Sequence, residues 1–383
     1  MNIEQFDAGA YETRYEYKSF LPTNIHHVWV IADPEIQDLL GRADRALGEL
    51  NAFAQLIPDI DFCIQMYVAK EATQSSKIEG TQTNIEDAFK ESDDVSPDAR
   101  NDWGEVQNYI QAINFAIGKL ETLPFSNRLL KETHSILMQG VLGEHKQPGE
   151  FRSSQNWIGV SLKNAVFVPP HHEHVVSLMS DMELFLHDTE QKVPPLIKIA
   201  LAHYQFETIH PFLDGNGRLG RLMISLYLAS EHLLYKPALY LSDYFERNKT
   251  AYVDHLMAVR QGHHLRKWLV FFLYGVEETA RSSINVFKQI LELKTGIEQQ
   301  VLPRFSSRRQ NNAQQLIRNL YGRPVIDIKS TAQLLKTTPN TANALIADFI
   351  KYGVLKEITG QQRNRLFLFA DYLALFRKEL EFE

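Results

Sequence analysis

The sequence lacks the features of several protein classes. Its 383 residues include one cysteine, Cys63, which cannot form a disulfide within the chain and fits a reducing compartment. No run of about 18 apolar residues occurs, so no helix is expected to span a membrane. The first residues carry no apolar segment behind a basic start and do not resemble a signal peptide. We therefore expect a cytoplasmic protein with no membrane contact.

Charge is present in both signs but is unevenly divided. The formal net charge is −7, yet residues 303–383 hold 13 Lys and Arg against 7 Asp and Glu, a net of +6. The preceding 302 residues therefore carry a net charge of −13. A step of this size indicates a domain boundary near residue 303. A hydrophobic content of 44% excludes a largely disordered chain, and the length suggests two or three domains.

Helical periodicity dominates the chain up to residue 300. Residues 196–209 are apolar almost all round, which is typical of a central buried helix. Residues 151–168 interrupt the pattern with two stretches rich in aromatic and β-branched residues, joined by Ser-Leu-Lys-Asn, which predicts a β-hairpin. The expected helices cover residues 62–79, 103–120, 127–139, 174–187, 196–209, 218–232, 242–260, 266–280 and 283–300.

The pattern changes after residue 303. Helix–turn–helix followed by a hairpin is the order of a winged-helix domain, and we expect one here. The first helix of the helix–turn–helix is short, and Ser330 and Gln333 are predicted to form the capping box at its start. The expected elements are a helix at 311–321, a strand at 325–328, a short helix ending near Lys336, a helix at 341–352, a hairpin around Gly-Gln-Gln-Arg-Asn and a last helix at 371–380.

The segment HPFLDGNGRLGR, from His210 to Arg221, joins two of the expected helices. Its glycines let backbone N–H groups converge, and a helix N-terminus adds positive potential, which together suit an anion. Arg218 and Arg221 lie three apart on the first turn, and two guanidinium groups beside such a loop suit a polyphosphate. Asp214 offers a hard oxygen ligand for Mg²⁺, and His210 can accept a proton near neutral pH. Base, metal ligand and phosphate-binding groups thus fall within one short segment.

This segment resembles the signature of the Fic family, His-x-Phe-x-Asp/Glu-Gly-Asn-Gly-Arg-x-x-Arg, at every specified position. The resemblance covers roughly residues 60–260 and includes the hairpin, which resembles the flap of the family. It implies a Fic-type helical bundle that transfers AMP from ATP to a Tyr, Thr or Ser hydroxyl of a target protein. In such an enzyme His210 would be the catalytic base and Asp214 would hold Mg²⁺. The flap would align the protein substrate by strand addition.

The resemblance also implies which residues bind ATP. The loop and Arg218 would hold the α- and β-phosphates, Arg221 would meet the γ-phosphate, and Asn248 would lie beside the nucleotide. The implied ATP-binding set is Glu79, His210, Gly215, Asn216, Gly217, Arg218, Leu219, Gly220, Arg221 and Asn248.

A second motif runs from Ser75 to Gly80 and has the sequence SSKIEG. It matches the pattern Ser/Thr-x-x-x-Glu-Gly/Asn, which is inhibitory in many members of the family. A carboxylate at a helix C-terminus meets the negative end of the helix dipole, which favours a cationic partner elsewhere in the fold. We expect Glu79 to pair with Arg221 and to inhibit the enzyme, with Gly80 ending the helix.

The expected organisation is an N-terminal helical region with the inhibitory helix at 1–100, a Fic catalytic domain at 101–300 and a winged helix at 303–383. An alternative hypothesis is a DNA-binding or partner-binding regulator in which the winged helix has the principal role. Its candidate recognition helix, near Thr338, offers one basic side chain, Lys351, and no arginine for guanine. The sequence is compatible with a homodimer but identifies no interface, and it does not name the target protein.

Overall fold

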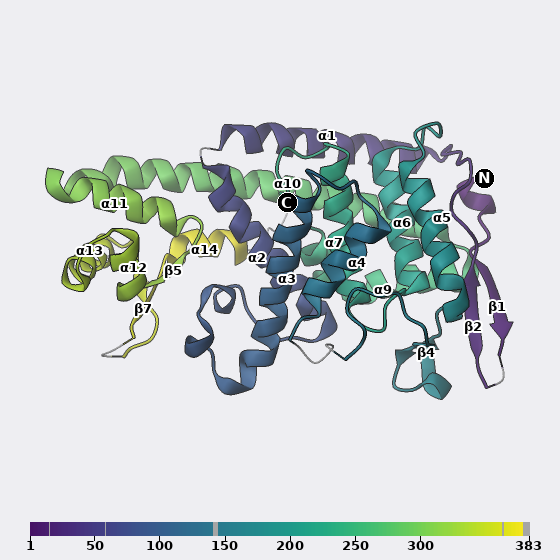
Figure 1. The fold of residues 1–383 in the computed structure, drawn as a ribbon. Helices are drawn as coiled ribbons and strands as arrows, with labels where there is room; N and C mark the ends of the chain where they lie inside the picture. The colour runs from purple at the N-terminus through teal and green to yellow at the C-terminus, as the bar shows by residue number, and fades with distance from the viewer. Residues whose placement is uncertain (15, 58, 141–144, 362–363, 378–383) are drawn as a thin grey trace.

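The computed structural model describes residues 1–383 except 15, 58, 141–144, 362–363 and 378–383, and it is mainly helical, as expected (Figure 1). The chain begins with an antiparallel hairpin of β1 (Gly9–Thr13) and β2 (Lys18–Pro22). The expectation of a helical region throughout residues 1–100 is therefore wrong for this segment. Tyr11 faces Phe20 across the two strands with ring centroids 5.2 Å apart, and such cross-strand aromatic pairs stabilise a hairpin.

Two long helices, α1 (Pro34–Leu56) and α10 (Leu265–Gly296), lie side by side along one edge of the molecule (Figure 1). The sequence predicted two helices in place of α10, at 266–280 and 283–300, and this prediction is wrong. The expected break falls next to Ser283, which is buried and donates a hydrogen bond to the carbonyl of Ala238 at 3.2 Å. Because a partner across the bundle satisfies this hydroxyl, the polar stretch continues as a helix.

The centre of the bundle is α6 (Pro195–Ile209), in which every residue from Leu196 onward is buried. This confirms the expectation for a helix that is apolar all round. It packs against α5 (Val175–His187) and α7 (Asn216–Ser230). The surrounding helices are α2 (Ile60–Glu79), α3 (Arg100–Lys119), α4 (Asn127–Leu137), α8 (Ser242–Arg247) and α9 (Lys249–Gly262).

The predicted helix at 242–260 is divided in two. Asn248 separates α8 from α9 with a φ of −112° and a ψ of 32°, which is outside the helical range. Its side-chain amide donates to the carbonyl of Tyr244 at 2.9 Å, which turns the chain between the two helices. The expectation of one continuous helix is wrong, because local bonding by an asparagine side chain competes with the helix.

The predicted hairpin at 151–168 is present but short. It consists of β3 (Ile158–Gly159) and β4 (Ala165–Phe167), joined by a 3-10 turn at Leu162–Asn164. Residues 151–157 do not extend β3, because Arg152 and Asn156 bond instead to the loop that follows α6. The hairpin therefore projects from a stem that is fastened to the predicted catalytic segment.

The described part of the C-terminal segment has four helices and a three-stranded antiparallel sheet of order β5-β7-β6. The helix–strand–helix–helix–strand–strand order is that expected of a winged helix, while assignment to this domain class stays a prediction. The capping box was predicted one turn too late: Asp327 is the N-cap, and Ser330 is its partner at the third position. The elements are α11 (Ser307–Leu320), β5 (Val325–Asp327), α12 (Ile328–Leu334), α13 (Pro339–Lys351), β6 (Lys356–Glu357), β7 (Leu366–Leu368) and α14 (Ala370–Arg377).

The last described helix, α14, turns back and packs on α2 and α10 (Figure 1). The ring of Phe376 meets that of Tyr67 at 5.3 Å, and Tyr67 in turn contacts Phe287 at 5.4 Å. The domain boundary near residue 303 stays a prediction, but the hydrophobic core is continuous across it. The end of the predicted helix at 371–380 and part of the predicted wing lie outside the described residues.

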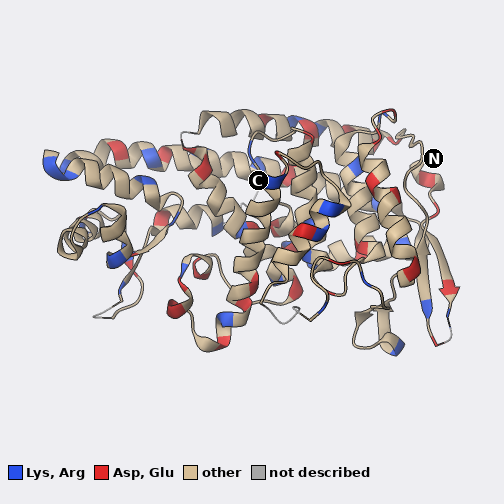
Figure 2. Cartoon of the chain, in the orientation of Figure 1, with Lys and Arg blue, Asp and Glu red and all other residues tan. Residues whose placement is uncertain are grey.

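The basic side chains behind the charge step are distributed over α11 to α13 and the adjoining segments (Figure 2). One of them, Arg309 of α11, pairs with Asp348 of α13 at 2.5 Å. They do not gather on one element, so the excess of charge does not by itself outline a binding face. No described helix has a stretch that is long and apolar enough to cross a membrane.

Candidate active site

The predicted phosphate loop lies between α6 and α7. His210 ends α6 in the left-handed conformation, with a φ of 51°, and Gly215 precedes α7 with a φ of 72°. Asn216 closes the loop on itself: its side chain accepts from the backbone N–H of Phe212 and donates to the carbonyl of the same residue, each at 2.8 Å. The loop thus opens a helix N-terminus, which is the arrangement that the sequence predicted for an anion site.

The backbone of this loop is held by side chains that the sequence analysis missed. Arg152 is buried and donates to the carbonyl of His210 at 2.9 Å. Asn156 donates to the carbonyls of His210 and Phe212 at 3.1 and 2.8 Å. Both residues come from the stem of the flap, so the flap and the loop form one rigid unit. Arg152 and Asn156 are more than 50 residues before the loop in the sequence, so no short motif connects them with it.

On the opposite side, His134 of α4 stacks on Phe212 with ring centroids 3.9 Å apart. Its Nδ1 accepts from the backbone N–H of Gly149, so its Nε2 carries the proton and donates to the carbonyl of Asp214 at 3.0 Å. Burial lowers the pKa of His134 to about 4, which keeps the ring neutral and this tautomer in place. The second histidine of the site is therefore a support for the loop.

His210 itself presents an unengaged imidazole. Its Nδ1 is buried and has no hydrogen-bond partner within the part of the chain that the structure describes. Burial, together with the positive charges of Arg260 and Arg152, lowers the pKa of His210 to about 3, while the charge of Glu79 opposes this shift. The ring is therefore neutral at physiological pH and has a lone pair available to accept a proton.

Arg221 donates three hydrogen bonds to residues of the predicted inhibitory motif. Its Nε donates to Oγ of Ser75, and one terminal nitrogen donates to the Ser75 carbonyl and to Oε1 of Glu79, all at 2.8 Å. The Arg221 side chain is 2% exposed and that of Glu79 is 44% exposed, so the carboxylate covers the arginine from the solvent side. Burial opposes ionisation of Glu79, but Arg221 outweighs it and holds the pKa below its usual value. The predicted pair is present.

Arg218 also pairs with a carboxylate, and this one was not predicted. Its terminal nitrogen donates to Oε2 of Glu105, on α3, at 2.9 Å. A second contact, to the sulfur of Met138, is 3.8 Å long. The Nε of Arg218 is buried and has no partner among the residues that the structure describes. Burial raises the pKa of Glu105, and the charge of Arg218 opposes that shift.

The glycines of the loop leave room for carboxylates. A Cβ atom at Gly217 would lie 2.3 Å from Oε1 of Glu79, and one at Gly220 would lie 2.3 Å from Oε1 of Glu207. Gly220 and Leu219 are buried, so only their backbone could face a ligand. Glu207 is itself buried next to this helix, and burial raises its pKa to about 7. At both positions, which lie in the first turns of α7, the absence of a side chain leaves space for a neighbouring carboxylate.

Asp214 is exposed, and its Oδ1 accepts from the backbone N–H of Gly215 at 2.6 Å. No group of three or more His, Cys, Asp or Glu side chains is arranged for a metal ion in the described part of the chain. A single exposed carboxylate beside a phosphate loop fits Mg²⁺, which in nucleotide sites takes one or two carboxylates and completes its shell with phosphate and water. Asn248 lies one residue before Lys249, which contacts the end of α2.

Two family models match consecutive parts of the chain. Residues 37–118 match the Fic/DOC family N-terminal model, and residues 124–228 match the Fic/DOC family model. Residues 124–228 are therefore similar to the domain that this family shares. The second match contains the flap and the loop from His210 to Arg221, and the first contains Glu79 and Glu105. The resemblance seen in the sequence is therefore confirmed.

Relatives and solved structures agree with this assignment. The chain is 32% identical over 131 residues to "Protein adenylyltransferase fic-1" of Caenorhabditis briggsae, and 30% identical over 125 residues to "Protein adenylyltransferase Fic" of Drosophila grimshawi. These matches cover 31% and 30% of this chain, and about a quarter of the length of each relative (25%). A Fic family protein from Desulfovibrio desulfuricans G20 has the same fold, with a TM-score of 0.54 at 20% identity, over 89% of this chain and 97% of that one.

Proposed function

We propose that this protein transfers AMP from ATP to a hydroxyl group of a target protein, and that Glu79 restrains the reaction. The curated relatives of its Fic domain are named protein adenylyltransferases, although the matches cover only part of each. The observation that carries the proposal is the loop itself, where a neutral His210 stands beside a helix N-terminus and two buried arginines.

In this reaction the loop amides and Arg218 hold the α- and β-phosphates, and Arg221 holds the γ-phosphate once Glu79 has left it. His210 accepts the proton of the attacking hydroxyl as the bond to the α-phosphorus forms and pyrophosphate leaves. Asp214 would hold Mg²⁺, which neutralises phosphate charge when bound. Positioning and charge neutralisation are what phosphoryl-type transfers require most of the protein. Asn248 is assigned to the nucleotide by the resemblance of its segment to the family.

The flap is proposed to bind the protein substrate. Apolar side chains face solvent on β4, at Val166, and on either side of β3, at Trp157 and Val160, the last of which is 93% exposed. An extended segment added to the free edge of such a hairpin would gain main-chain hydrogen bonds and cover these side chains. Because Arg152 and Asn156 fasten the stem to the loop, a hydroxyl carried by that segment would be held near His210.

The test is transfer of label. The protein is incubated with target lysate and with ATP labelled at either the α- or the γ-phosphate, and modified proteins are identified by mass spectrometry. We expect label on protein from the α-phosphate alone, and none with the His210→Ala variant. Label from the γ-phosphate would instead establish kinase chemistry and would contradict the proposal.

The alternative, a regulator acting through the C-terminal segment, gains no comparable support. The candidate recognition helix, α13, begins after Thr338 and has its one basic residue at its last position. Binding to DNA through phosphate contacts would weaken steeply as salt is raised, and this dependence is the measurement that would establish it.

A further inference from the structure

The last four carbonyls of α2, at residues 76–79, have no donor within the helix, as at every helix end. Two of them are satisfied locally: the N–H of Gly80 donates to the Lys77 carbonyl at 3.1 Å, and the N–H of Thr81 donates to that of Ser76 at 3.2 Å. The carbonyl of Ile78 receives its donor from elsewhere in the fold. The ammonium group of Lys249 reaches it at 2.6 Å. Lys249 therefore completes the cap on the residue that directly precedes Glu79.

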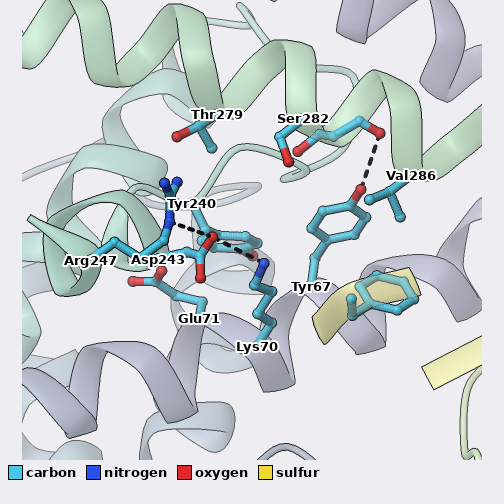
Figure 3. Close-up of a pocket in the computed structure, with 11 residues that line it drawn as sticks. Tyr67, Lys70, Glu71, Tyr240, Asp243, Arg247, Thr279, Ser282 and Val286 are labelled. Carbon is cyan, nitrogen blue, oxygen red and sulfur yellow. Dashed lines mark hydrogen bonds and ion pairs between the residues drawn. The ribbon is translucent and has the colours of Figure 1, made fainter. Parts of the chain in front are cut away.

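Other contacts hold α2 to α8, but they act farther from Glu79 or at the surface. Figure 3 shows Asp243 of α8 between Lys70 of α2 and Arg247, beside a cavity of about 30 Å³ that α2, α8, α10 and α14 line. Asp243 lies 3.1 Å from Lys70, which is more than two turns of helix away from Glu79. Buried Glu71 accepts from the hydroxyl of Ser242 at 2.6 Å, also two turns away.

Besides the pair of Glu79 with Arg221, the ion pair of Lys77 with Glu246 joins the last turn of α2 to α8. Nζ of Lys77 lies 2.9 Å from Oε1 of Glu246, and the Lys77 side chain is half exposed. Pairs of this kind contribute little, because water screens them and both side chains lose freedom. A bond from an ammonium group to a main-chain carbonyl at a helix C-terminus is charge-assisted and also favoured by the helix dipole. The contact of Lys249 therefore adds to the bonds that Arg221 makes with Ser75 and Glu79 in fixing where the end of α2 lies.

We propose that Lys249 is a positioning residue for the inhibitory carboxylate. By bonding to the Ile78 carbonyl, its ammonium group fixes the last turn of α2, and so keeps Glu79 against Arg221. This inference rests on the proposed function, because it assumes that Glu79 restrains AMP transfer. It adds a cause for the restraint that lies outside the inhibitory motif. Since Asn248 precedes Lys249, a nucleotide bound beside Asn248 would lie next to the group that anchors the inhibitory helix.

The test uses the full-length protein and a matched pair of substitutions. Lys249→Met keeps the aliphatic stem and removes the donor, while Lys249→Arg keeps a charged donor. We expect Lys249→Met to raise AMP transfer about 5- to 30-fold, which is the effect of losing one charge-assisted hydrogen bond. Lys249→Arg should remain near the unsubstituted protein. Lys249 is exposed, and Lys249→Gln provides a second neutral variant.

The same substitutions in a Glu79→Gly background separate the two proposals. With Glu79 gone, Lys249→Met should produce no further rise and no fall, because nothing is left to position. A fall in that background would mean that Lys249 serves the nucleotide directly, and would overturn the inference. If Glu79→Gly is activated and Lys249→Met alone is not, the inference is wrong and the restraint by Glu79 stands. If Glu79→Gly itself is not activated, the proposed restraint fails.

Hydrogen exchange gives a readout that does not depend on activity. The N–H groups of Gly80 and Thr81 close the end of α2, and their bonds break when the last turn opens. We expect both amides to exchange faster in Lys249→Met than in Lys249→Arg, with the rest of the bundle unchanged. Equal exchange in the two variants would show that Lys249 does not hold this turn.

Discussion

Arg218 and Arg221 lie one turn apart on α7, and each pairs with a carboxylate from a different helix. Glu105, on α3, is 17% exposed, whereas Glu79, at the last position of α2, is 44% exposed. The two pairs differ most in how many donors they use. Arg221 gives its Nε and a terminal nitrogen to Ser75 and Glu79, whereas Arg218 keeps an Nε without a partner among the described residues.

This difference indicates that the two arginines are prepared differently for a nucleotide. Arg218 can donate to a phosphate while Glu105 holds it in place, because a guanidinium group has five N–H donors and few are used. Arg221 must first lose Glu79. We therefore infer that Glu105 positions Arg218 for a phosphate, whereas Glu79 keeps Arg221 from one. By the proposed function, one arginine of the site is therefore available to the nucleotide while the other is still paired with Glu79.

By the proposed function the arginines and the loop amides bind the phosphates, while His210 acts on the incoming hydroxyl. His210→Ala should therefore lower AMP transfer by about 10²- to 10⁴-fold, the usual effect of losing a general base, and leave ATP affinity nearly unchanged. Radiolabel transfer and isothermal titration with ATP measure the two quantities. Undiminished transfer at neutral pH would remove His210 from its assigned role.

Release of the withheld arginine should have the next largest effect. Glu79→Gly should raise transfer about 10²-fold, since ATP that cannot reach Arg221 binds displaced and an ångström of displacement can cost about this factor. Folding should be little affected, because a helix end tolerates glycine. The control is the double variant Glu79→Gly, Arg221→Ala, in which the gain should disappear. Activity at or below that of the unsubstituted protein would contradict the restraint.

Removal of the other carboxylate, Glu105, should weaken the site where removal of Glu79 activates it. In a Glu79→Gly background, Glu105→Ala should weaken ATP binding about 10-fold, near the low end of what a charge-assisted hydrogen bond contributes. Glu105→Gln keeps an acceptor for Arg218 and should lose less. Binding curves for the three proteins measure the effect. Tighter binding by Glu105→Ala would mean that Glu105 competes with the nucleotide, and the two pairs would then be alike.

The smallest expected difference between the two pairs lies in the pH at which Glu79 and Glu105 are protonated. Burial raises the pKa of Glu105 above its ordinary value of 4.5, whereas Arg221 holds that of Glu79 below 4.5 against the effect of burial. On acidification Glu105 should therefore take up its proton first. The two linkages have opposite signs. Ionised Glu79 adds stability above pH 4.5, and this is lost as the pH falls through its folded pKa.

Protonated Glu105, in contrast, stabilises the folded protein. This contribution to the free energy of unfolding is lost as the pH rises through the raised pKa of Glu105. Carbon NMR of labelled glutamates resolves the two transitions, and Glu79→Gln and Glu105→Gln assign them. The reverse order, with Glu79 protonated first, would show that Arg221 does not hold the charge of Glu79.

The active-site loop could be predicted from the sequence because its chemistry is local. His210, Asp214 and Arg221 fall in one short segment, and glycine positions report the backbone that they require. The Glu79–Arg221 pair was also found, through the resemblance of its motif. Glu105, Arg152 and Lys249 were not, because each acts on a partner far away in the chain, and nothing in local spacing points to such a partner.

The misses in the fold have the same origin. A polar stretch around Ser283 suggested a helix end, but a carbonyl from another element satisfies the hydroxyl inside α10. In the C-terminal segment the N-cap of α12 is Asp327 and not Ser330, because β5 ends at Asp327 and the helix begins directly after it. The sequence analysis missed α1, although its start carries a local signal: Asp33 followed by Pro34 is a typical N-cap and first helical position.

Gly217 has a consequence for how the restraint could be lost. The volume that a Cβ would take there is used by the carboxylate of Glu79, and by the proposed function a phosphate uses the same neighbourhood when Glu79 is absent. A side chain at 217 would expel both anions alike. Substitution at this position thus cannot yield an unrestrained enzyme, and escape from inhibition must begin on the helix that carries Glu79 or on the residues that fasten it.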